Sequence, residues 1–340
     1  MFTWRRLKNL LNKNERAGEM LRYYTLWGEK LRDTYEKVEE LRRIPRSIQV
    51  IGMGGSGIVG YIIKDMVYGK GLPIDIHIFN SPNIPRHRIK KSLNILVSHS
   101  GNTIEVLEAA KLIKEVGGEA IIITSDGLME DIADRYGWRL YKIEPAPLPR
   151  LALPQLIAPI LKILRHRLRL GEIAKSSKRL DRYIRSQIMG RGGGEAFKIS
   201  RALYGIKPVI YYTDGNESIA YRFKAMLNEN SKHEAYTSYI PEIFHNQIEI
   251  YTSALDSLHT PYILMGDDIY TKILKEFLIR RRIYYIDWMP MKTRDILYRY
   301  LAGIALHDVT SIYLAVMKGV DPYTTPSISM YKELIREWSS

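Results

Sequence analysis

Cysteine is absent from this sequence of 340 residues, and acidic residues are fewer than basic ones. Without cysteine, the chain can form no disulfide, no thiolate metal site and no cysteine nucleophile. The 37 Asp and Glu residues are outnumbered by 51 Lys and Arg residues, which gives a formal net charge of +14. A charge of this sign attracts anionic partners, from nucleic acids to small phosphorylated substrates.

Long apolar runs are also missing. No segment approaches the ~20 apolar residues that cross a bilayer. The longest candidate lies at 151–161 and is interrupted by Pro154, Gln155 and Pro159. The N-terminal residues lack the apolar core of a signal peptide. We therefore expect a cytoplasmic protein without a membrane partner. Its length and its 46% hydrophobic content predict two folded domains.

Strands and helices are predicted to alternate along most of the chain. Helical periodicity covers 3–43 and recurs at 104–117, 219–232 and 293–318. The apolar runs predict strands at 47–51, 73–79, 93–98, 120–124, 208–213, near 248–252, 262–265 and 283–287. This alternation is typical of βαβ units, so we expect an α/β protein with two halves, each a mostly parallel sheet flanked by helices. Such folds bind ligands at the carboxyl ends of their strands.

Shifts in composition suggest where the chain divides. Proline-rich residues follow the first α/β half, and a basic helical stretch precedes the second. The expected segments are N-terminal helices at 1–45, a first α/β half at 46–150, a helical basic linker at 151–195, a second half at 196–320 and a tail at 321–340.

The positive charge is concentrated in residues 161–191, which hold ten Lys and Arg and two acids and so carry +8 of the +14. Such a stripe could bind nucleic acid. A helical linker with a solvated basic face explains it more simply, and no known nucleic-acid-binding motif accompanies the charge. We therefore predict no nucleic-acid partner. The apolar stripe of this linker would consist of Leu161, Leu164, Leu168, Ile173, Leu180 and Ile184.

A glycine-rich loop follows the first predicted strand. Gly52, Gly54 and Gly57 match the GxGxxG spacing, and an anion at the following helix N-terminus is physically reasonable. A dinucleotide site also needs an acidic residue at the end of the next strand, but that strand ends in Phe79 and Asn80. The loop is therefore a phosphate site or a tight turn without a ligand, rather than an NAD site.

A second loop of small residues, 98–103 (SHSGNT), also follows a strand and opens a helix. Its hydroxyl groups, together with Ser56 of the glycine loop, could surround one phosphate, and they suit a monophosphate better than a pyrophosphate. Ser100 or Thr103 could instead cap the helix. The two roles are compatible, so both stay open.

These loops carry a family resemblance. The segments IGMGGSGIVG and VSHSGNTIEVLEAA resemble the two signatures of a sugar isomerase (SIS) domain. Four further segments make the resemblance more specific, because together they resemble archaeal and bacterial bifunctional phosphoglucose/phosphomannose isomerases. These segments are LPRLALPQL, NENSK, IPEIFHNQI and GVDPYTTPSISMYKEL. The similarity runs from about residue 47 to the C-terminus. It implies two SIS subdomains, a homodimer, no metal or other cofactor, and the interconversion of glucose 6-phosphate or mannose 6-phosphate with fructose 6-phosphate.

The resemblance also implies roles for individual residues. Glu229 would be the base that forms a cis-enediol(ate), Arg150 would face the reacting carbons, and His245 would open the sugar ring, in this family across the dimer interface. The residues expected to bind the phosphate and nearby substrate atoms are Gly55, Ser56, Ser98, Ser100 and Thr103. Thr325 and Lys332 of the tail would line the sugar site. The sequence departs from the family at His99, where Tyr is usual, and at Ser231, where Ala is common.

Taken singly, the candidate Glu, Arg, His and Lys side chains have ordinary structural interpretations, and only their shared motifs favour catalysis. Three other functions remain open from the sequence: a non-catalytic SIS sensor of a sugar phosphate, a nucleic-acid-binding protein, and an SIS isomerase for hexulose or amino-sugar phosphates. The histidines show no HxxxH pair, which argues against a zinc-dependent mannose-phosphate isomerase.

Overall fold

Two parallel β-sheets form the framework of the computed structural model, which describes residues 2–41, 43–252, 262–288 and 293–339. The strand order is β2-β1-β3-β4-β5 in the first sheet and β7-β6-β8-β9 in the second, and every pair is parallel. The predicted α/β fold with two parallel sheets is thus confirmed. The strands are β1 Ser47–Gly52, β2 Asp75–Phe79, β3 Ser92–Val97, β4 Ala120–Thr124, β5 Arg139–Lys142, β6 Val209–Tyr212, β7 Tyr236–Tyr239, β8 Tyr262–Met265 and β9 Tyr285–Trp288.

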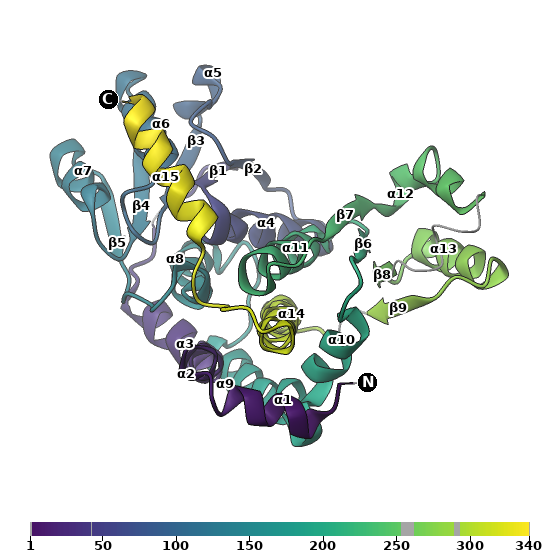
Figure 1. Cartoon of the computed structure of the whole chain (residues 1–340). Coiled ribbons are helices and arrows are strands. Elements are labelled where there is room, and N and C mark those ends of the chain that lie inside the picture. Colours follow the sequence, from purple (N-terminus) through teal and green to yellow (C-terminus); the bar gives the residue numbers. More distant parts are fainter. Residues whose placement is uncertain (1, 42, 253–261, 289–292, 340) are drawn as a thin grey trace.

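Helices surround both sheets and separate the first lobe, built on β1–β5, from the second lobe, built on β6–β9 (Figure 1). Those before and within the first lobe are α1 Trp4–Leu11, α2 Glu15–Tyr24, α3 Trp27–Lys37, α4 Gly54–Gly69, α5 Arg86–Ile89, α6 Ile104–Glu115 and α7 Leu128–Tyr136. The later ones are α8 Leu153–Leu164, α9 Ile173–Tyr183, α10 Gly194–Leu203, α11 Glu217–Ser231, α12 Ile240–Ile243, α13 Ile269–Arg280, α14 Ile296–Lys318 and α15 Pro326–Ser339.

The first sheet is covered on both faces. In β4, Ile121 and Ile123 belong to the apolar cluster on the α4 and α8 side, whereas Ile122 belongs to the cluster on the α6 and α7 side. Because both faces are buried, the strand is apolar at successive positions instead of alternating with polar residues. This explains why the central strands were recognisable as short apolar runs.

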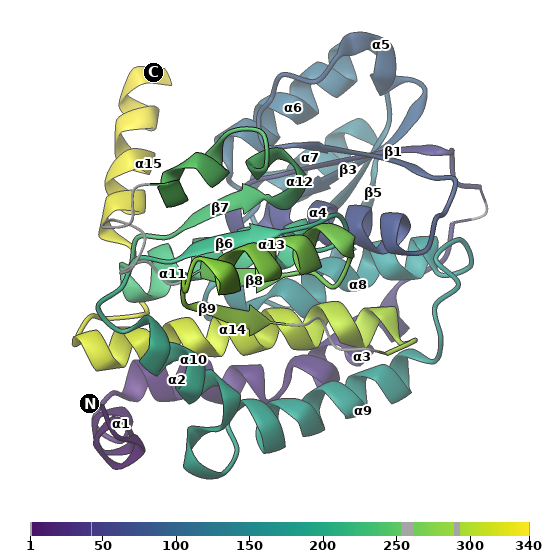
Figure 2. The same ribbon diagram turned by 90° about the vertical axis from the view of Figure 1, so that its right-hand side faces the viewer.

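The helix α14 lies at the centre of the molecule. Its length and composition would allow it to cross a membrane, but it is wholly surrounded by protein. It packs against α9, α10 and α11 and against the N-terminal helices α1 and α2, as Figure 2 shows from the side. It is therefore the core helix of an α/β fold.

The basic segment also contributes to this core. All six apolar residues predicted for its stripe are buried, namely Leu161, Leu164, Leu168, Ile173, Leu180 and Ile184. The stripe prediction is confirmed: the segment packs through α8, α9 and the π-helical turn Ile184–Ile188 that follows.

A buried ion pair joins α11, α14 and α2. Arg222 donates through Nη2 to Asp308 Oδ2 at 2.8 Å, and Tyr24 donates its hydroxyl to the same oxygen at 2.9 Å. The same Nη2 also donates to the backbone carbonyl of Arg150. Burial alone would lower the pKa of Arg222, but the attraction of Asp308 raises it above its usual range. The guanidinium therefore stays charged inside the core.

The first forty residues are part of this core. Trp27 is fully buried, and its indole N–H donates to the carbonyl of Leu151 at 3.1 Å. The backbone N–H of Gly28 donates to the carboxylate of Asp181 at 2.7 Å. Through these contacts α3 packs on α8 and α9 and supports the segment that precedes α8.

The prediction of a strand near 248–252 is wrong. Residues Gln247–Thr252 form a 3₁₀ helix, and the edge of β6 is occupied by β7, Tyr236–Tyr239. The reason is the crossover: α11 returns the chain directly to that edge, so residues 236–239 pair with β6 first. The edge strand β5, Arg139–Lys142, was not predicted either, because its alternating polar residues give no apolar run.

Candidate active site

The two loops singled out in the sequence lie side by side at the carboxyl edge of the first sheet. Strands β1 and β3 are adjacent and parallel, and the chain leaves β1 toward β2 on one side while β3 lies on the other. This is the topological switch point, where open α/β sheets bind ligands. Both loops therefore end where a small anionic ligand is expected.

The glycine loop is held against its neighbour by Ser56. The Ser56 hydroxyl accepts a hydrogen bond from the backbone N–H of His99 at 3.1 Å, which joins the loop after β1 to the loop after β3. Gly57 is required by packing, because a Cβ there would lie 2.4 Å from the carbonyl oxygen of Gly52. The tight approach lets α4 begin at Gly54, directly at the strand end, where its N-terminal N–H groups favour an anion.

The second loop gathers hydroxyl groups. Ser98 and Thr103 lie 2.9 Å apart through their hydroxyl oxygens, and the Ser100 hydroxyl accepts from the backbone N–H of Asn102 at 3.3 Å. Thr103 is the N-cap residue of α6, but its side chain makes no capping hydrogen bond. Capping therefore does not explain this hydroxyl, which is turned toward Ser98.

His99, the departure from the family pattern, stabilises the loop. Its Nε2 accepts a hydrogen bond from the backbone N–H of Ala146 at 3.1 Å, so this nitrogen carries no proton. Burial lowers the pKa of the His99 imidazole, which favours this neutral form. Its carbonyl accepts from both the backbone and the hydroxyl of Ser125.

Arg150 lies directly beside the glycine loop. Its Cα is 3.2 Å from where a Cβ on Gly55 would stand, so a larger residue would push the two segments apart. The side chain is buried: Nε donates to Asn230 Oδ1 at 2.8 Å, and Nη2 donates to the carbonyls of Pro322 at 2.7 Å and Tyr323 at 2.8 Å. Burial lowers the pKa of Arg150, and the nearby Glu229 carboxylate acts in the opposite direction.

Glu229 faces the remaining nitrogen of Arg150. Its Oε2 lies 3.8 Å from Nη1, and the exposed fraction of its side chain is 22%, against 5% for Arg150. Among the residues that the structure describes, Nη1 has no hydrogen-bond partner, while Nε and Nη2 are engaged. A guanidinium N–H group without a hydrogen-bond partner therefore faces a partly exposed carboxylate.

The tail runs from α14 to the first lobe. Thr325 is half-buried, and its carbonyl accepts from the backbone N–H groups of Ile328 and Ser329 at the start of α15. Lys332 is exposed on α15, and its neighbour Tyr331 donates to Glu105 in the first turn of α6 at 3.3 Å. Through this hydrogen bond the tail reaches α6, the helix that follows the second loop.

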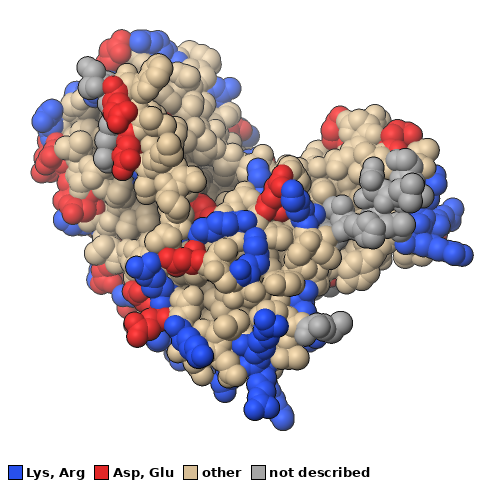
Figure 3. All heavy atoms as spheres, viewed as in Figure 1, with Lys and Arg blue, Asp and Glu red and all other residues tan. Residues whose placement is uncertain are grey.

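His245 is not brought to this place. It is exposed on the turn after α12, which lies on the second lobe, across the molecule from α15 (Figure 1). Figure 3 shows a hollow between the two lobes. Within one chain, His245 therefore stands apart from Glu229 and Arg150.

The corresponding edge of the second sheet differs in charge. A cavity of about 530 Å³ there is lined by Asp214, Asp267 and Asp268, with Arg299 as a basic residue. Asp214 accepts from the hydroxyl of Tyr68 at 3.0 Å. These carboxylates would repel a phosphate, so the hydroxyl-lined edge of the first sheet is the better anion site.

Two residues of the NENSK segment belong to the site but were not singled out from the sequence. Asn230 joins Arg150 to α14, because its Nδ2 donates to the hydroxyl of Ser311 at 2.8 Å. Lys232 donates to carbonyls of α11 and of the tail. Their shared motif was the available signal, but only its Glu was weighed as a functional group.

The chain is similar to known proteins along most of its length. Residues 194–335 match the family model of the bacterial phospho-glucose isomerase C-terminal SIS domain. The chain is 27% identical over 307 residues to the bifunctional phosphoglucose/phosphomannose isomerase of Aquifex aeolicus, covering 86% of this chain and 91% of that one. It is also 29% identical over 259 residues to a D-glucosamine-6-phosphate 4-epimerase of Sulfolobus acidocaldarius, covering 74% of this chain and 78% of the other.

Solved structures share the fold over almost the whole chain. A hypothetical protein of Thermus thermophilus aligns with a TM-score of 0.71 at 15% identity, over 98% of this chain and 94% of that one. The C-terminal domain of the glucosamine-fructose-6-phosphate aminotransferase of Francisella tularensis aligns with a TM-score of 0.64 at 17% identity, over 89% and 97%. The chain is thus similar over most of its length to bifunctional phosphoglucose/phosphomannose isomerases, and residues 194–335 match the C-terminal SIS domain of bacterial phospho-glucose isomerases.

Proposed function

We propose that this protein is a cytoplasmic aldose–ketose isomerase that interconverts glucose 6-phosphate or mannose 6-phosphate with fructose 6-phosphate. One observation carries the proposal: Glu229 and the unengaged Nη1 of Arg150 lie together, 3.8 Å apart, and Arg150 packs against Gly55 of the glycine loop. A carboxylate, a guanidinium and the glycine loop are thus contiguous. The net charge of +14 would favour the approach of a sugar phosphate.

The phosphate would bind at the carboxyl edge of the first sheet. Its oxygens would take hydrogen bonds from Ser56, Ser98, Ser100 and Thr103 and from the N–H groups that begin α4, including that of Gly55. The 2.9 Å contact between the Ser98 and Thr103 hydroxyls supports this, because it places two donors next to each other. The sugar would extend from there toward Arg150.

The proton transfer would then take place beside Arg150. Glu229 would remove a proton from one of the two reacting carbons and return it to the other, so that one carboxylate serves as base and acid. Negative charge develops on the enediolate oxygen, and Nη1 of Arg150 is the donor positioned for it. Since Nε and Nη2 are held by Asn230 and the tail, the guanidinium would not need to reorient.

Turnover of both epimers requires room in the site. Glucose 6-phosphate and mannose 6-phosphate share one enediol, which gives one or the other epimer according to the face that it presents to the base, so the intermediate would rotate about C2–C3. The small side chain of Thr325, at the start of α15, would leave space for this rotation. Lys332 would line the same part of the site.

Ring opening needs a group that exchanges protons near neutral pH, which suits His245. Because His245 stands apart from Glu229 within one chain, we propose that a homodimer supplies it from the second copy. Mixing two inactive variants tests this. Refolding equal amounts of Glu229→Gln and His245→Ala chains should restore about one quarter of the wild-type sites, since half of the dimers are mixed and each holds one intact site. Mixtures that stay as inactive as the separate variants would contradict the shared site.

The decisive experiment on the reaction is a coupled assay with EDTA present. Glucose 6-phosphate and mannose 6-phosphate are supplied separately, and fructose 6-phosphate is detected. We expect turnover of both. Turnover of glucose 6-phosphate alone would discredit the role given to Thr325. Binding of the sugar phosphates without turnover would favour the non-catalytic sensor of a sugar phosphate. Because one relative is an amino-sugar phosphate epimerase, glucosamine 6-phosphate is tested in parallel, and its consumption alone would replace the proposed substrates.

A further inference from the structure

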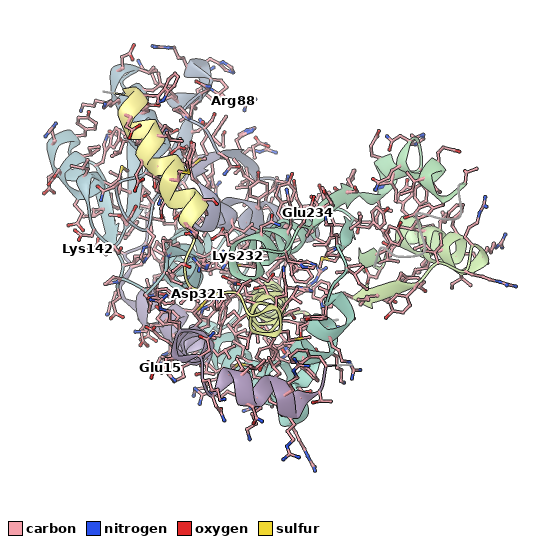
Figure 4. All side chains as sticks on the ribbon, viewed as in Figure 1. Glu15, Arg88, Lys142, Lys232, Glu234 and Asp321 are labelled. Atoms are coloured by element: carbon pink, nitrogen blue, oxygen red, sulfur yellow. The ribbon has the colours of Figure 1, made fainter. Side chains whose placement is uncertain are left out.

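A short segment of the tail is held almost entirely by cations. Residues 321–324, here called the strap, connect α14 to Thr325 and α15. Four successive carbonyls of the strap accept hydrogen bonds from two side chains. Arg150 binds the carbonyls of Pro322 and Tyr323, and Lys232 binds those of Asp321 and Thr324, the last at 2.7 Å. Figure 4 shows Lys232 and Asp321 close together below the start of α15.

Lys232 is positioned for this by the end of α11. It follows the last residue of the helix with a φ of +47°, a left-handed conformation that is uncommon for residues other than glycine. Its Nζ also donates to the carbonyl of Glu229 at 2.9 Å. Burial and the charge of Arg150 lower the pKa of Lys232, and Asp321 and Glu229 act in the opposite direction. The ammonium thus joins the helix end that carries Glu229 to the strap.

We propose that Lys232 is a positioning residue that clamps the strap and thereby holds Thr325 and the Arg150 guanidinium in register with Glu229. This inference rests on the proposed function. The geometry is reciprocal: the strap engages Nη2 of Arg150 and so leaves Nη1 toward Glu229, while Lys232 fixes the strap from the other side. Without the clamp, the strap carbonyls would turn to water, and the guanidinium and Thr325 would lose their fixed position.

Lys318 provides a matched control. Its Nζ also donates to carbonyls at the end of α11, those of Ser231 at 2.9 Å and Lys232 at 3.0 Å, but none of its described contacts reaches the strap. The positive charges of both lysines interact favourably with the negative, C-terminal end of the α11 dipole. A difference between the two variants therefore isolates the clamp from the general support that a cation gives to this helix end.

The test compares Lys232→Met with Lys318→Met in the full chain, through steady-state kinetics with glucose 6-phosphate and amide hydrogen exchange. For Lys232→Met we expect kcat to fall by about tenfold to a hundredfold, as a displacement of about 1 Å at a reacting group does. KM should change little because the phosphate loops are untouched. Amide exchange should become faster across 321–334. Lys318→Met should keep the wild-type kcat and tail protection.

Three results would overturn the proposal: a wild-type kcat in Lys232→Met, unchanged exchange in its tail, or the same losses in Lys318→Met. Hydrogen exchange needs no turnover. A protein that proves inactive on every sugar phosphate would therefore refute the proposed function, while the exchange data would still decide whether Lys232 holds the strap.

Discussion

Replacing Glu229 with Gln is expected to lower kcat by about 10²–10⁴-fold, the range that a positioned acid–base group contributes. The amide keeps the shape of the side chain beside Arg150 but cannot accept the proton from the reacting carbon. The coupled assay with glucose 6-phosphate measures the effect. Affinity for inorganic phosphate, measured by calorimetry, should stay near the wild-type value because the phosphate loops belong to another part of the site.

Glu234→Gln is the matched control for this substitution. Glu234, labelled in Figure 4, lies five positions further along the chain, is exposed, and pairs with Lys207. It should leave kcat unchanged. If Glu229→Gln keeps substantial turnover, Glu229 is not the base, and the proposed proton transfer is refuted even if the enzyme acts on these sugars.

The second large effect concerns stability. Arg222→Met is expected to reduce the free energy of unfolding by about 3–5 kcal/mol, because it leaves the carboxylate of Asp308 buried without its cation. Arg222 and Asp308 have exposed side-chain fractions of 2% and 0%, so solvent cannot replace the partner. Urea unfolding followed by circular dichroism measures the loss. The exposed pair Arg280–Glu276 is the control, and Arg280→Met should change the stability by no more than about 0.5 kcal/mol.

A double variant separates the charge from the packing. In Arg222→Met combined with Asp308→Leu, no buried charge is left unpaired, so part of the stability should return. If Arg222→Met alone costs less than about 1 kcal/mol, the pair does not hold α11 to α14 as inferred. The carbonyl of Arg150 also loses its donor in both variants, so their kcat should fall even where the fold recovers.

The sequence was sufficient for the architecture because the central strands are short apolar runs between recognisable helices. Ala120–Thr124 and Tyr262–Met265 were predicted with their observed bounds, since each is buried on both faces. Edge strands were harder. Tyr236–Tyr239 is partly exposed and lacks an apolar run, so it was not predicted. Polar and apolar residues alternate at 247–252 as in a strand, but this segment forms a 3₁₀ helix.

Of the candidate site, the sequence predicted only the residues that belong to recognisable motifs. The two phosphate loops followed from small residues at strand ends, and Glu229 and Arg150 followed from the family resemblance. Their mutual position did not, because it depends on a contact between segments about eighty residues apart. The partners of Arg150 were also beyond sequence reasoning, since two of them are backbone carbonyls, Pro322 and Tyr323, which any residue type would provide.

The packing of the N-terminal helices on α14 has a consequence for synthesis. Tyr24 and its partner Asp308 are 284 residues apart in sequence, and Arg16 pairs with Asp321 at a separation of 305. During synthesis, α2 must wait for α14 before the buried hydroxyl of Tyr24 finds its partner Asp308. Contacts of this range form late and slowly. The core is therefore closed by α1 and α2 packing on α14, and a chain that stops before α14 leaves the apolar faces of these two helices uncovered.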